Sequence, residues 1–316
     1  MKTLWGFALM CLCAWANAQT YPVKPIRLVV GYPPGGSGDF TTRIIGDELG
    51  KELGVTIVIE NKPGAGGSIA SEFVAKAAPD GYTLLNQGNH AINRNLYKSL
   101  PYDTKDFAPI CRVALGTTIL VVASNSPFNS ARELVAYAKA NPGKLFSASA
   151  GFGSAPHLAS AGFEAAAGVQ FTTIQFKGGG PASQSLLAGD TQVMFATSPT
   201  VTGFIKGGRM RPLLVSLPKG SPSIPGIPGS DEAGVPGYSS TFWFGLWAPA
   251  GTPPEIVRKL HAAAAKGLAK PEVRERIASQ GMDASPSASP EAFAAEIAAE
   301  VPSIEAAIRA SGAKVD

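Results

Sequence analysis

The chain has 316 residues, of which 45% are hydrophobic, and this is enough apolar material for about two domains of ordinary size. The formal net charge is only +4, and the basic residues are spread along the chain without a Lys/Arg block. Nucleic-acid binding is therefore not expected.

Residues 1–18 have the pattern of a secretory signal peptide. Lys2 precedes an apolar run from Leu4 to Trp15, and the run ends in the small-residue pattern Ala16–Ala18. We therefore expect cleavage before Gln19 and a periplasmic mature protein. The run is shorter than the ~20 residues of a membrane-spanning helix. A buried N-terminal helix is the less favoured alternative.

The positions of the three cysteines indicate an exported protein without an internal disulfide. A lipoprotein is disfavoured because Met10 and Leu12, rather than small residues, precede Cys11 and Cys13. Removal of residues 1–18 takes away one lysine and two cysteines, which lowers the net charge from +4 to +3 and leaves Cys111. A single thiol cannot form an internal disulfide, so the fold must depend on its hydrophobic core.

The mature chain alternates short β-rich runs with helical patterns, as is typical of parallel α/β sheets. The first series predicts strands at Ile26–Val30, Val55–Ile59, Tyr82–Leu85 and Ile119–Ala123, and helices from about Asp39 to Leu53 and over Ser68–Ala77. The second series opens with a helix that a capping box of Ser130 and Glu133 would start and that ends before Asn141. It continues with strands at Leu145–Ala148, Phe171–Phe176, Gln192–Ala196 and Leu213–Ser216, and helices at His157–Ala167, Pro181–Ala188 and Pro199–Lys206.

The last part of the chain returns to the first pattern. Pro218–Gly237 is rich in Pro, Gly and Ser and is interpreted as an ordered linker. A strand is expected at Phe242–Ala248, and Thr252 is expected to be the N-cap of a helix with Pro253 in its first turn. The remainder, to Ile308, is expected to be helical.

Two linkers, near 124–130 and 218–240, bracket the central α/β block. We therefore predict a discontinuous lobe 1 (19–123 plus 240–316) with lobe 2 (124–239) inserted into it. A double crossing between lobes makes a hinge and an interlobe cleft, and such clefts are favoured ligand sites.

The loop 31–39 lies between a predicted strand and a predicted helix. Its glycines allow a ligand to approach the backbone, and the first N–H groups of the helix would favour an anion. The loop lacks the G-K-[ST] ending of a P-loop and the G-x-G-x-x-G spacing of dinucleotide sites. A tight turn with Asp39 as N-cap explains the residues equally well.

Two further glycine-rich loops precede helices in lobe 2. Residues 150–157 repeat the arrangement of loop 31–39, so the two loops would hold a carboxylate from both sides of the cleft. Residues 177–181 would close the pocket wall or, as the alternative, would form a flexible connection.

Catalytic and metal-binding patterns are weak. There is no G-x-S-x-G elbow, and Ser154 with His157 lacks a third partner. His90, His157 and His261 lack metal-ligand spacing. We therefore expect neither an enzyme nor a metal site nor a cofactor, and Cys111 is expected to be a passive buried thiol.

Short motifs along nearly the whole mature chain resemble those of the tripartite tricarboxylate transporter substrate-binding proteins, or Bug receptors. The matching stretches are Tyr21–Ile26, Pro33–Gly36 with Asp39, Glu60–Gly67, Pro79–Leu85, Leu100–Asp103, Gly153-Ser154 with His157-Leu158, Lys177-Gly178, Trp243–Leu246 and Ala248–Pro253.

The resemblance implies an α/β fold of the type II periplasmic-binding-protein kind, with two lobes that close on a carboxylate through backbone amides and ordered waters. It implies a monomeric receptor that binds a small carboxylate and delivers it to the membrane permease subunits of a tripartite tricarboxylate-type transporter. By position, one side of the site would contain Tyr32, Pro33, Gly35, Gly36, Ser37 and Asp39, and the other side Gly153, Ser154 and His157. Lys177, Gly178, Thr197 and Ser198 are further candidates for ligand contact.

Three departures from the family pattern bear on specificity. Phe176 stands where a Tyr is frequent, and Ala196-Thr197-Ser198 lacks an acidic residue that pairs with a ligand amine. The sequence therefore favours a non-amino organic acid, aliphatic or aromatic. The departure at Ile227–Ser230 has no clear functional meaning.

Two other functions remain open from the sequence. A ligand-sensing co-receptor needs the same hinge as a transport receptor. A periplasmic hydrolase is the minor alternative, because its motifs are absent.

Overall fold

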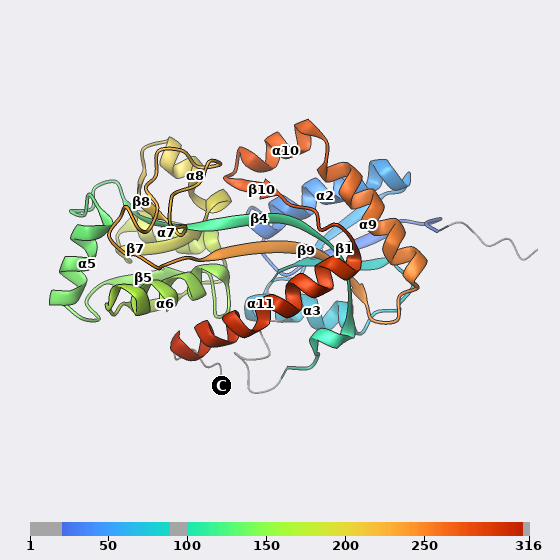
Figure 1. Cartoon of the computed structure of the whole chain (residues 1–316), viewed down its shortest axis with the longest axis horizontal. Coiled ribbons are helices and arrows are strands. Elements are labelled where there is room, and N and C mark those ends of the chain that lie inside the picture. Colours follow the sequence, from blue (N-terminus) through green and yellow to red (C-terminus); the bar gives the residue numbers. More distant parts are fainter. Residues whose placement is uncertain (1–20, 89–99, 312–316) are drawn as a thin grey trace, which may run out of the picture.

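The computed structural model describes residues 21–88 and 100–311, with side chains in the second range as far as Pro302. The signal peptide predicted at 1–18 lies outside these residues, as does His90. Two long strands, β4 (Phe107–Ala123) and β9 (Thr241–Pro249), run along the middle of the molecule and join two groups of elements (Figure 1). Within the described ranges, no helix is both long and apolar enough to cross a membrane.

Lobe 1 contains the blue and cyan elements and the orange and red helices of Figure 1. Its sheet has the order β2-β1-β3-β9-β4, with β10 added to β4. The strands β1 (Ile26–Val30), β2 (Ile57–Asn61) and β3 (Thr83–Gln87) are parallel, whereas β9 is antiparallel to both β3 and β4. The helices of lobe 1 are α2 (Ser37–Leu53), α3 (Ser68–Ala75), α9 (Pro254–Leu268), α10 (Pro271–Ala278) and α11 (Pro290–Ser311), and there are short 3-10 turns at Ala65–Gly67 and Thr104–Asp106.

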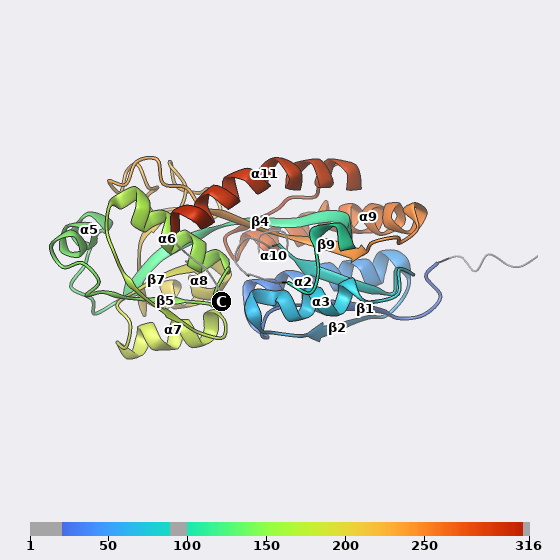
Figure 2. The ribbon, with the colours of Figure 1, turned by 90° about the horizontal axis from the view of Figure 1, so that it is seen from below.

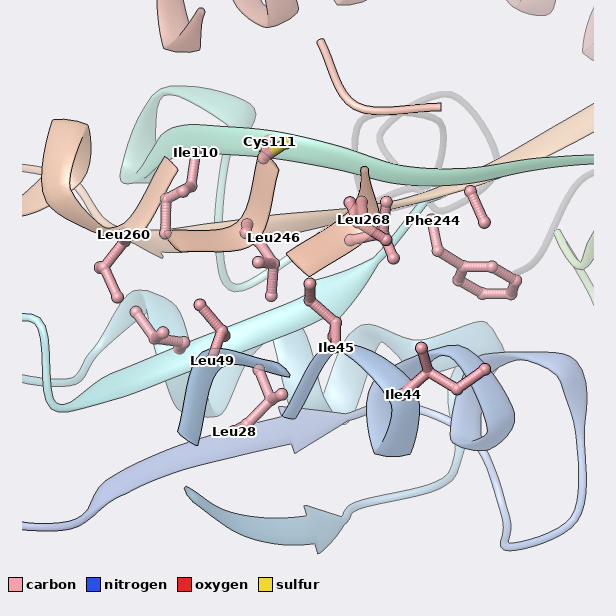
Figure 3. Packing of buried hydrophobic residues seen from close by; sticks show 14 of the residues in the cluster. Leu28, Ile44, Ile45, Leu49, Ile110, Cys111, Phe244, Leu246, Leu260 and Leu268 are labelled. Atoms are coloured by element: carbon pink, nitrogen blue, oxygen red, sulfur yellow. The ribbon is translucent and has the colours of Figure 1, made fainter. Parts of the chain in front are cut away.

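The main core of lobe 1 lies between α2, α9 and the sheet. Ile45 and Leu49 of α2 pack with Leu246 of β9 and Leu260 of α9, all at most 1% exposed (Figure 3). The apolar residues of α2 recur at helical spacing, so one face of the helix is buried against the sheet. This burial fixes α2, and with it the loop that leads from β1 into the helix.

Lobe 2 has the same construction with different strands. Its sheet order is β8-β4-β7-β5-β6, formed by β5 (Phe146–Ser149), β6 (Thr172–Gln175), β7 (Val193–Thr197), β8 (Met210–Val215) and the end of β4. The parallel strands β6, β5 and β7 feed the helices α7 (Gly179–Ala188), α6 (Ala155–Ala167) and α8 (Ser198–Lys206), and α5 (Ala131–Ala140) completes the lobe.

The chain crosses from lobe 1 to lobe 2 inside a strand. Residues 107–117 of β4 pair with β9, whereas residues 118–123 pair with β7 and β8. The strand therefore starts 12 residues before its predicted beginning at Ile119. The lobe limits predicted at 123 and 240 stay a proposal, and the change of partners after Thr117 favours an earlier first limit.

Several local predictions need correction. The predicted N-cap Thr252 is wrong: Pro253 caps α9, and the Thr252 hydroxyl donates to the Pro249 carbonyl at 2.7 Å. The capping box of α5 is only half formed, because the Glu133 carboxylate accepts from the Asn129 amide instead of the N-cap amide. The short strand β10 (Met282–Ala284) was predicted as part of a helical region, but it pairs with β4.

Helix α11 spans the two lobes. It starts in lobe 1, runs along β4 and ends against α6 of lobe 2 (Figure 2). Together with β4 and β9 it makes a third connection between the lobes.

Candidate ligand-binding cavity

A cavity of about 300 Å³ lies between the lobes. Lobe 1 contributes loop 31–39 and the start of β9, and lobe 2 contributes the beginnings of α6, α7 and α8 together with part of β7. The described lining residues are Tyr32, Pro33, Pro34, Gly35, Gly36, Ser37, Gly38, Ala150, Ser154, Ala155, Pro156, Gly178, Gly179, Gly180, Pro181, Met194, Thr197, Thr200, Phe204, Phe242, Trp243 and Phe244.

Asp39 holds loop 31–39 from behind, away from the cavity. Its carboxylate accepts from the Gly35 amide at 3.0 Å, from Asn61 at 2.9 Å and from two guanidinium nitrogens of Arg43 at 2.9 Å. Burial raises the pKa of Asp39, but these hydrogen bonds outweigh it, so the pKa lies below its ordinary value. The carboxylate therefore stays ionised and keeps the loop in one conformation.

The N-terminus of α2 is open toward the cavity. Gly36 is the N-cap, with an extended backbone (φ −85°, ψ 172°) and no side-chain cap. The interpretation of Asp39 as N-cap is therefore wrong, since Asp39 is the third residue of the helix. Ser37 is only 8% exposed, lines the cavity, and its hydroxyl makes no hydrogen bond within the described residues.

Gly38 allows Tyr32 to pack onto the first turn of α2. A Cβ at Gly38 would lie 2.5 Å from Cδ2 of the Tyr32 ring, which is closer than real contacts allow. Asn61 donates to the Tyr32 carbonyl at 2.9 Å. Contacts on both the ring and the backbone thus position Tyr32 at the cavity.

The corresponding helix in lobe 2, α6, is capped by its own loop. The hydroxyl of the N-cap Ser154 accepts from the His157 amide at 3.4 Å and donates to the Gly151 carbonyl at 2.6 Å. The Gly153 amide donates to Nδ1 of His157 at 3.3 Å, so this nitrogen is the acceptor and the proton is on Nε2. His157 is 8% exposed, and burial lowers its pKa.

Helices α7 and α8 also begin at the cavity, and neither has a side-chain cap. The hydroxyls of Thr197 and Thr200 lie 2.9 Å apart, and either can donate to the other. One hydroxyl hydrogen of the pair therefore remains available to a ligand.

The lobes meet at the α7 loop. A Cβ at Gly178, whose φ is +114°, would lie 3.1 Å from Cγ of Pro33 in the opposite lobe. The backbone at Gly178 and the ring of Pro33 therefore come together beside the cavity.

Eight of the thirteen predicted site residues line the cavity, namely Tyr32, Pro33, Gly35, Gly36, Ser37, Ser154, Gly178 and Thr197. The other five, Asp39, Gly153, His157, Lys177 and Ser198, are not among the lining residues. Asp39, Gly153 and His157 support the two loops from behind, and the Ser198 hydroxyl donates to the Gly281 carbonyl at 2.8 Å. The role of all thirteen in ligand binding stays a prediction.

The residues that sequence reasoning missed are mainly apolar. Met194, Phe204 and three successive residues of β9, Phe242 to Phe244, line the cavity. Strand β9 pairs with β3 only as far as Gly245, so the preceding residues border the cavity along the side that β3 leaves open. The Trp243–Leu246 motif was a signal for this position, but nothing in its residues indicated contact with a ligand.

Metal ligands and the free thiol were the remaining candidates for chemistry at the cavity. They contain no group of three His, Cys, Asp or Glu side chains that could hold a metal ion. Cys111 is buried in the lobe 1 core, and burial raises the pKa of its thiol to about 11.

The tripartite tricarboxylate transporter family receptor model matches residues 41–312. The chain is 34% identical to the protein BugT of Bordetella pertussis over 274 residues, which are 85% of this chain and 84% of BugT. It superposes on the R. palustris protein Rpa4515 with adipate at a TM-score of 0.88, with 32% identity, 92% of this chain and 98% of that chain covered. It superposes on MatC from Rhodopseudomonas palustris with bound malate at 0.85, with 31% identity, 91% of this chain and all of MatC covered.

One solved structure of similar identity differs more in shape. A TctC solute-binding protein from Polaromonas without ligand is 32% identical, and 92% of this chain and 99% of that chain are covered, but the TM-score is 0.67. These comparisons agree with the two-lobed α/β fold described above. The chain therefore belongs to the tripartite tricarboxylate transporter family of receptors, which are periplasmic solute-binding proteins.

Proposed function

We propose that the protein captures a small carboxylate in the cavity between its lobes and delivers it to the permease subunits of a tripartite tricarboxylate-type transporter. One observation carries this proposal. The N-termini of four helices, α2, α6, α7 and α8, meet at one cavity whose described lining contains no charged side chain.

Such an arrangement suits an anion. The first N–H groups of a helix lack internal partners and carry the positive end of the helix dipole. A buried carboxylate is tolerated when it is well hydrogen-bonded, and backbone amides, the free Ser37 hydroxyl and ordered water can provide those bonds. The site thus needs no Arg clamp to bind a carboxylate.

The connections between the lobes favour binding by closure. Strand β4 continues from lobe 1 into lobe 2, and the chain returns to lobe 1 through β9; such strand connections can bend as a hinge. The superpositions point the same way: the TM-score is 0.88 with an adipate-bearing relative and 0.67 with one without ligand. We therefore take the present arrangement as the closed form.

The ligand is proposed to be a non-amino organic acid. Thr197, which lines the cavity, would lie near an ammonium group of an amino-acid ligand, and no Asp or Glu is among the described lining residues. An ammonium group would then lose its hydration without gaining a counter-charge, which costs free energy.

The first experiment is a thermal-shift screen of ligand-stripped protein with mono-, di- and tricarboxylates, aromatic acids and amino acids. A ligand at 100 times its Kd stabilises the fold by about 2.7 kcal/mol, and we expect a rise of roughly 5 °C in Tm with one class of acids. Folded protein with no shift for any acid would contradict carboxylate binding.

Delivery to a permease needs a separate test. We expect that cells lacking the gene for this protein lose uptake of the acid identified in the screen, as do cells lacking the permease genes. Unchanged uptake in the first strain, with loss of a transcriptional response to the acid, would instead support a sensing role.

A further inference from the structure

One wall of the cavity is apolar and comes from both lobes. Met194 of β7 and Phe204 of α8 lie on the lobe 2 side, and Phe242–Phe244 of β9 on the lobe 1 side. We infer that the bound acid has an uninterrupted apolar body, either an aromatic ring or a chain of at least four methylene groups, and not a hydroxylated one. This inference rests on the proposed carboxylate binding and adds the chemistry of the rest of the ligand.

The aromatic part of this wall is held in place by the core. Phe242 and Phe244 are 4% and 5% exposed, and their ring centroids lie 5.8 Å apart in an edge-to-face arrangement. Phe244 also packs edge-to-face on Tyr32, with centroids 6.0 Å apart. Because packing already holds these rings, binding of a flat or extended apolar group costs little free energy for ordering the protein side chains.

The Trp243 ring lies on the opposite face of β9 from Phe242 and Phe244, where it packs against Trp247 and against Phe293 of α11. Its indole Nε1 donates to the Glu300 carboxylate of α11 at 2.5 Å. The indole has no other hydrogen-bonding atom, so the Trp243 side chain adds no polar group to this wall.

Few groups remain to satisfy a hydroxylated ligand. The polar side chains among the described lining residues are five hydroxyls, of Tyr32, Ser37, Ser154, Thr197 and Thr200. The Ser154 hydroxyl already makes two hydrogen bonds, and the two Thr hydroxyls bond to each other, which leaves one hydroxyl hydrogen of the pair for a ligand. Each ligand hydroxyl pressed against the apolar wall would lose its water without gaining a partner, which disfavours binding.

Two matched pairs of acids test the inference. Adipate and galactarate share six carbons and two carboxylates, but four methylenes of adipate are hydroxylated in galactarate; hexanoate and gluconate form the corresponding pair with one carboxylate. Each methylene moved from water to an apolar wall favours binding about fourfold. In isothermal titration calorimetry we expect the apolar member of at least one pair to bind at least tenfold more tightly than its hydroxylated partner.

The outcomes separate this inference from the proposed function. Equal or tighter binding of galactarate or gluconate would overturn the apolar-body inference, and so would binding of malate or citrate with none of the four acids bound. In both cases carboxylate binding itself would stand. If no carboxylate binds to folded protein, the proposed function fails and the inference fails with it.

Variants of Phe204 test whether the apolar wall of the cavity causes the preference for apolar acids. Phe204 is only half buried on α8, so Phe204→Ala should fold, and we expect it to weaken the apolar acid about tenfold while leaving its hydroxylated partner unchanged. Phe204→Leu should restore most of the affinity. Such recovery would show that the loss in Phe204→Ala comes from the missing apolar surface and not from a folding defect. Tyr137→Ala, at an exposed aromatic residue of α5 in the same lobe, is the matched control and should bind as the wild type does. Equal losses for both members of a pair in Phe204→Ala would contradict an apolar subsite at this residue.

Discussion

The two loops that face each other across the cavity, 31–39 in lobe 1 and 150–157 in lobe 2, solve the same problem in different ways. Each must hold a glycine-rich backbone still at the start of a helix. In lobe 1 a buried carboxylate, Asp39, binds the loop from behind and leaves the N-terminus of α2 uncapped. In lobe 2 the N-cap hydroxyl of Ser154 and the ring of His157 hold the loop through neutral hydrogen bonds.

This difference suggests that lobe 1 makes the main contact with the anion and lobe 2 a smaller one. The open end of α2, with the free hydroxyl of Ser37, is better placed to bind an anion than the end of α6, where Ser154 already satisfies one amide. A charged support should also resist changes in pH down to low values, whereas a His support should weaken as the pH falls below ~6.5.

The largest effect is expected from filling the open end of α2. A Cβ at Gly36 would meet only the Pro33 carbonyl, at 3.7 Å, so Gly36→Val should fold with a stability change of less than about 1 kcal/mol. Its side chain would occupy space that the ligand needs, and we expect calorimetry to show at least a 100-fold loss of affinity. Gly203→Val, on α8 and outside the lining of this cavity, is the control, with normal binding. Normal affinity in Gly36→Val would show that ligands do not approach the backbone there.

The second-largest effect is expected from removing the charge of Asp39, which holds loop 31–39 of lobe 1. Asp39→Asn keeps the shape of the side chain but loses the ionic bonds to Arg43 and weakens the bond to the Gly35 amide. Hydrogen bonds to a charged group contribute about 1.5–3 kcal/mol, so we expect a loss of about 2 kcal/mol in the free energy of unfolding, measured by urea denaturation. Asp47→Asn, the same change at an exposed acid on the same helix, controls for the general effect of charge loss. A similar small loss in both variants would mean that Asp39 is not the support of the loop.

The Ser154 cap of lobe 2 should matter less. Ser154→Ala removes an N-cap hydroxyl, and such changes cost about 1 kcal/mol, or roughly 2–4 °C in Tm. We expect affinity to fall less than tenfold, because the Gly36–Gly38 side of the cavity stays intact. Ser154→Thr should retain most of the stability. If Ser154→Ala abolishes binding while Gly36→Val does not, lobe 2 rather than lobe 1 carries the main anion contact.

The sequence predicted the parts of this site that depend on local chemistry. Glycine-rich loops between a strand and a helix indicated where backbone amides would be open, and Gly36 and Ser154 do lie at helix starts beside the cavity. The parts that depend on distant partners were missed. In residues 107–118 no regular alternation marks a strand, since Pro109 and Arg112 interrupt it, and the pairing with β9, more than 120 residues away, makes it one. The aromatic wall was missed for the same reason, because Phe242–Phe244 border the cavity only where β3 ends.

The smallest predicted effect is the pH dependence that His157 gives to lobe 2. Burial lowers the pKa of His157 in the folded state below the ordinary value of 6.5, so the unfolded state binds the proton more tightly. Stability from this residue is therefore complete above pH ~6.5 and is lost as the pH falls toward the folded-state pKa. Between pH 7 and pH 6 the loss is at most about 0.7 kcal/mol, or roughly 1–3 °C in Tm.

The variant His157→Asn isolates this effect. The Asn side-chain oxygen can accept from the Gly153 amide in place of Nδ1, but it does not titrate. We expect the decrease in Tm between pH 7 and pH 6 to be smaller in this variant than in the wild type. The variant His261→Asn, at a His of α9 whose ring bonds to the Ser287 carbonyl at 2.9 Å, controls for the loss of a histidine outside the two loops. Asp39 should not contribute in this range, because its pKa lies below the ordinary value and its support is lost only at strongly acid pH. An identical pH dependence in wild type and His157→Asn would mean that the two loops do not differ in their response to protons, and the contrast between a charged and a neutral support would then concern geometry alone.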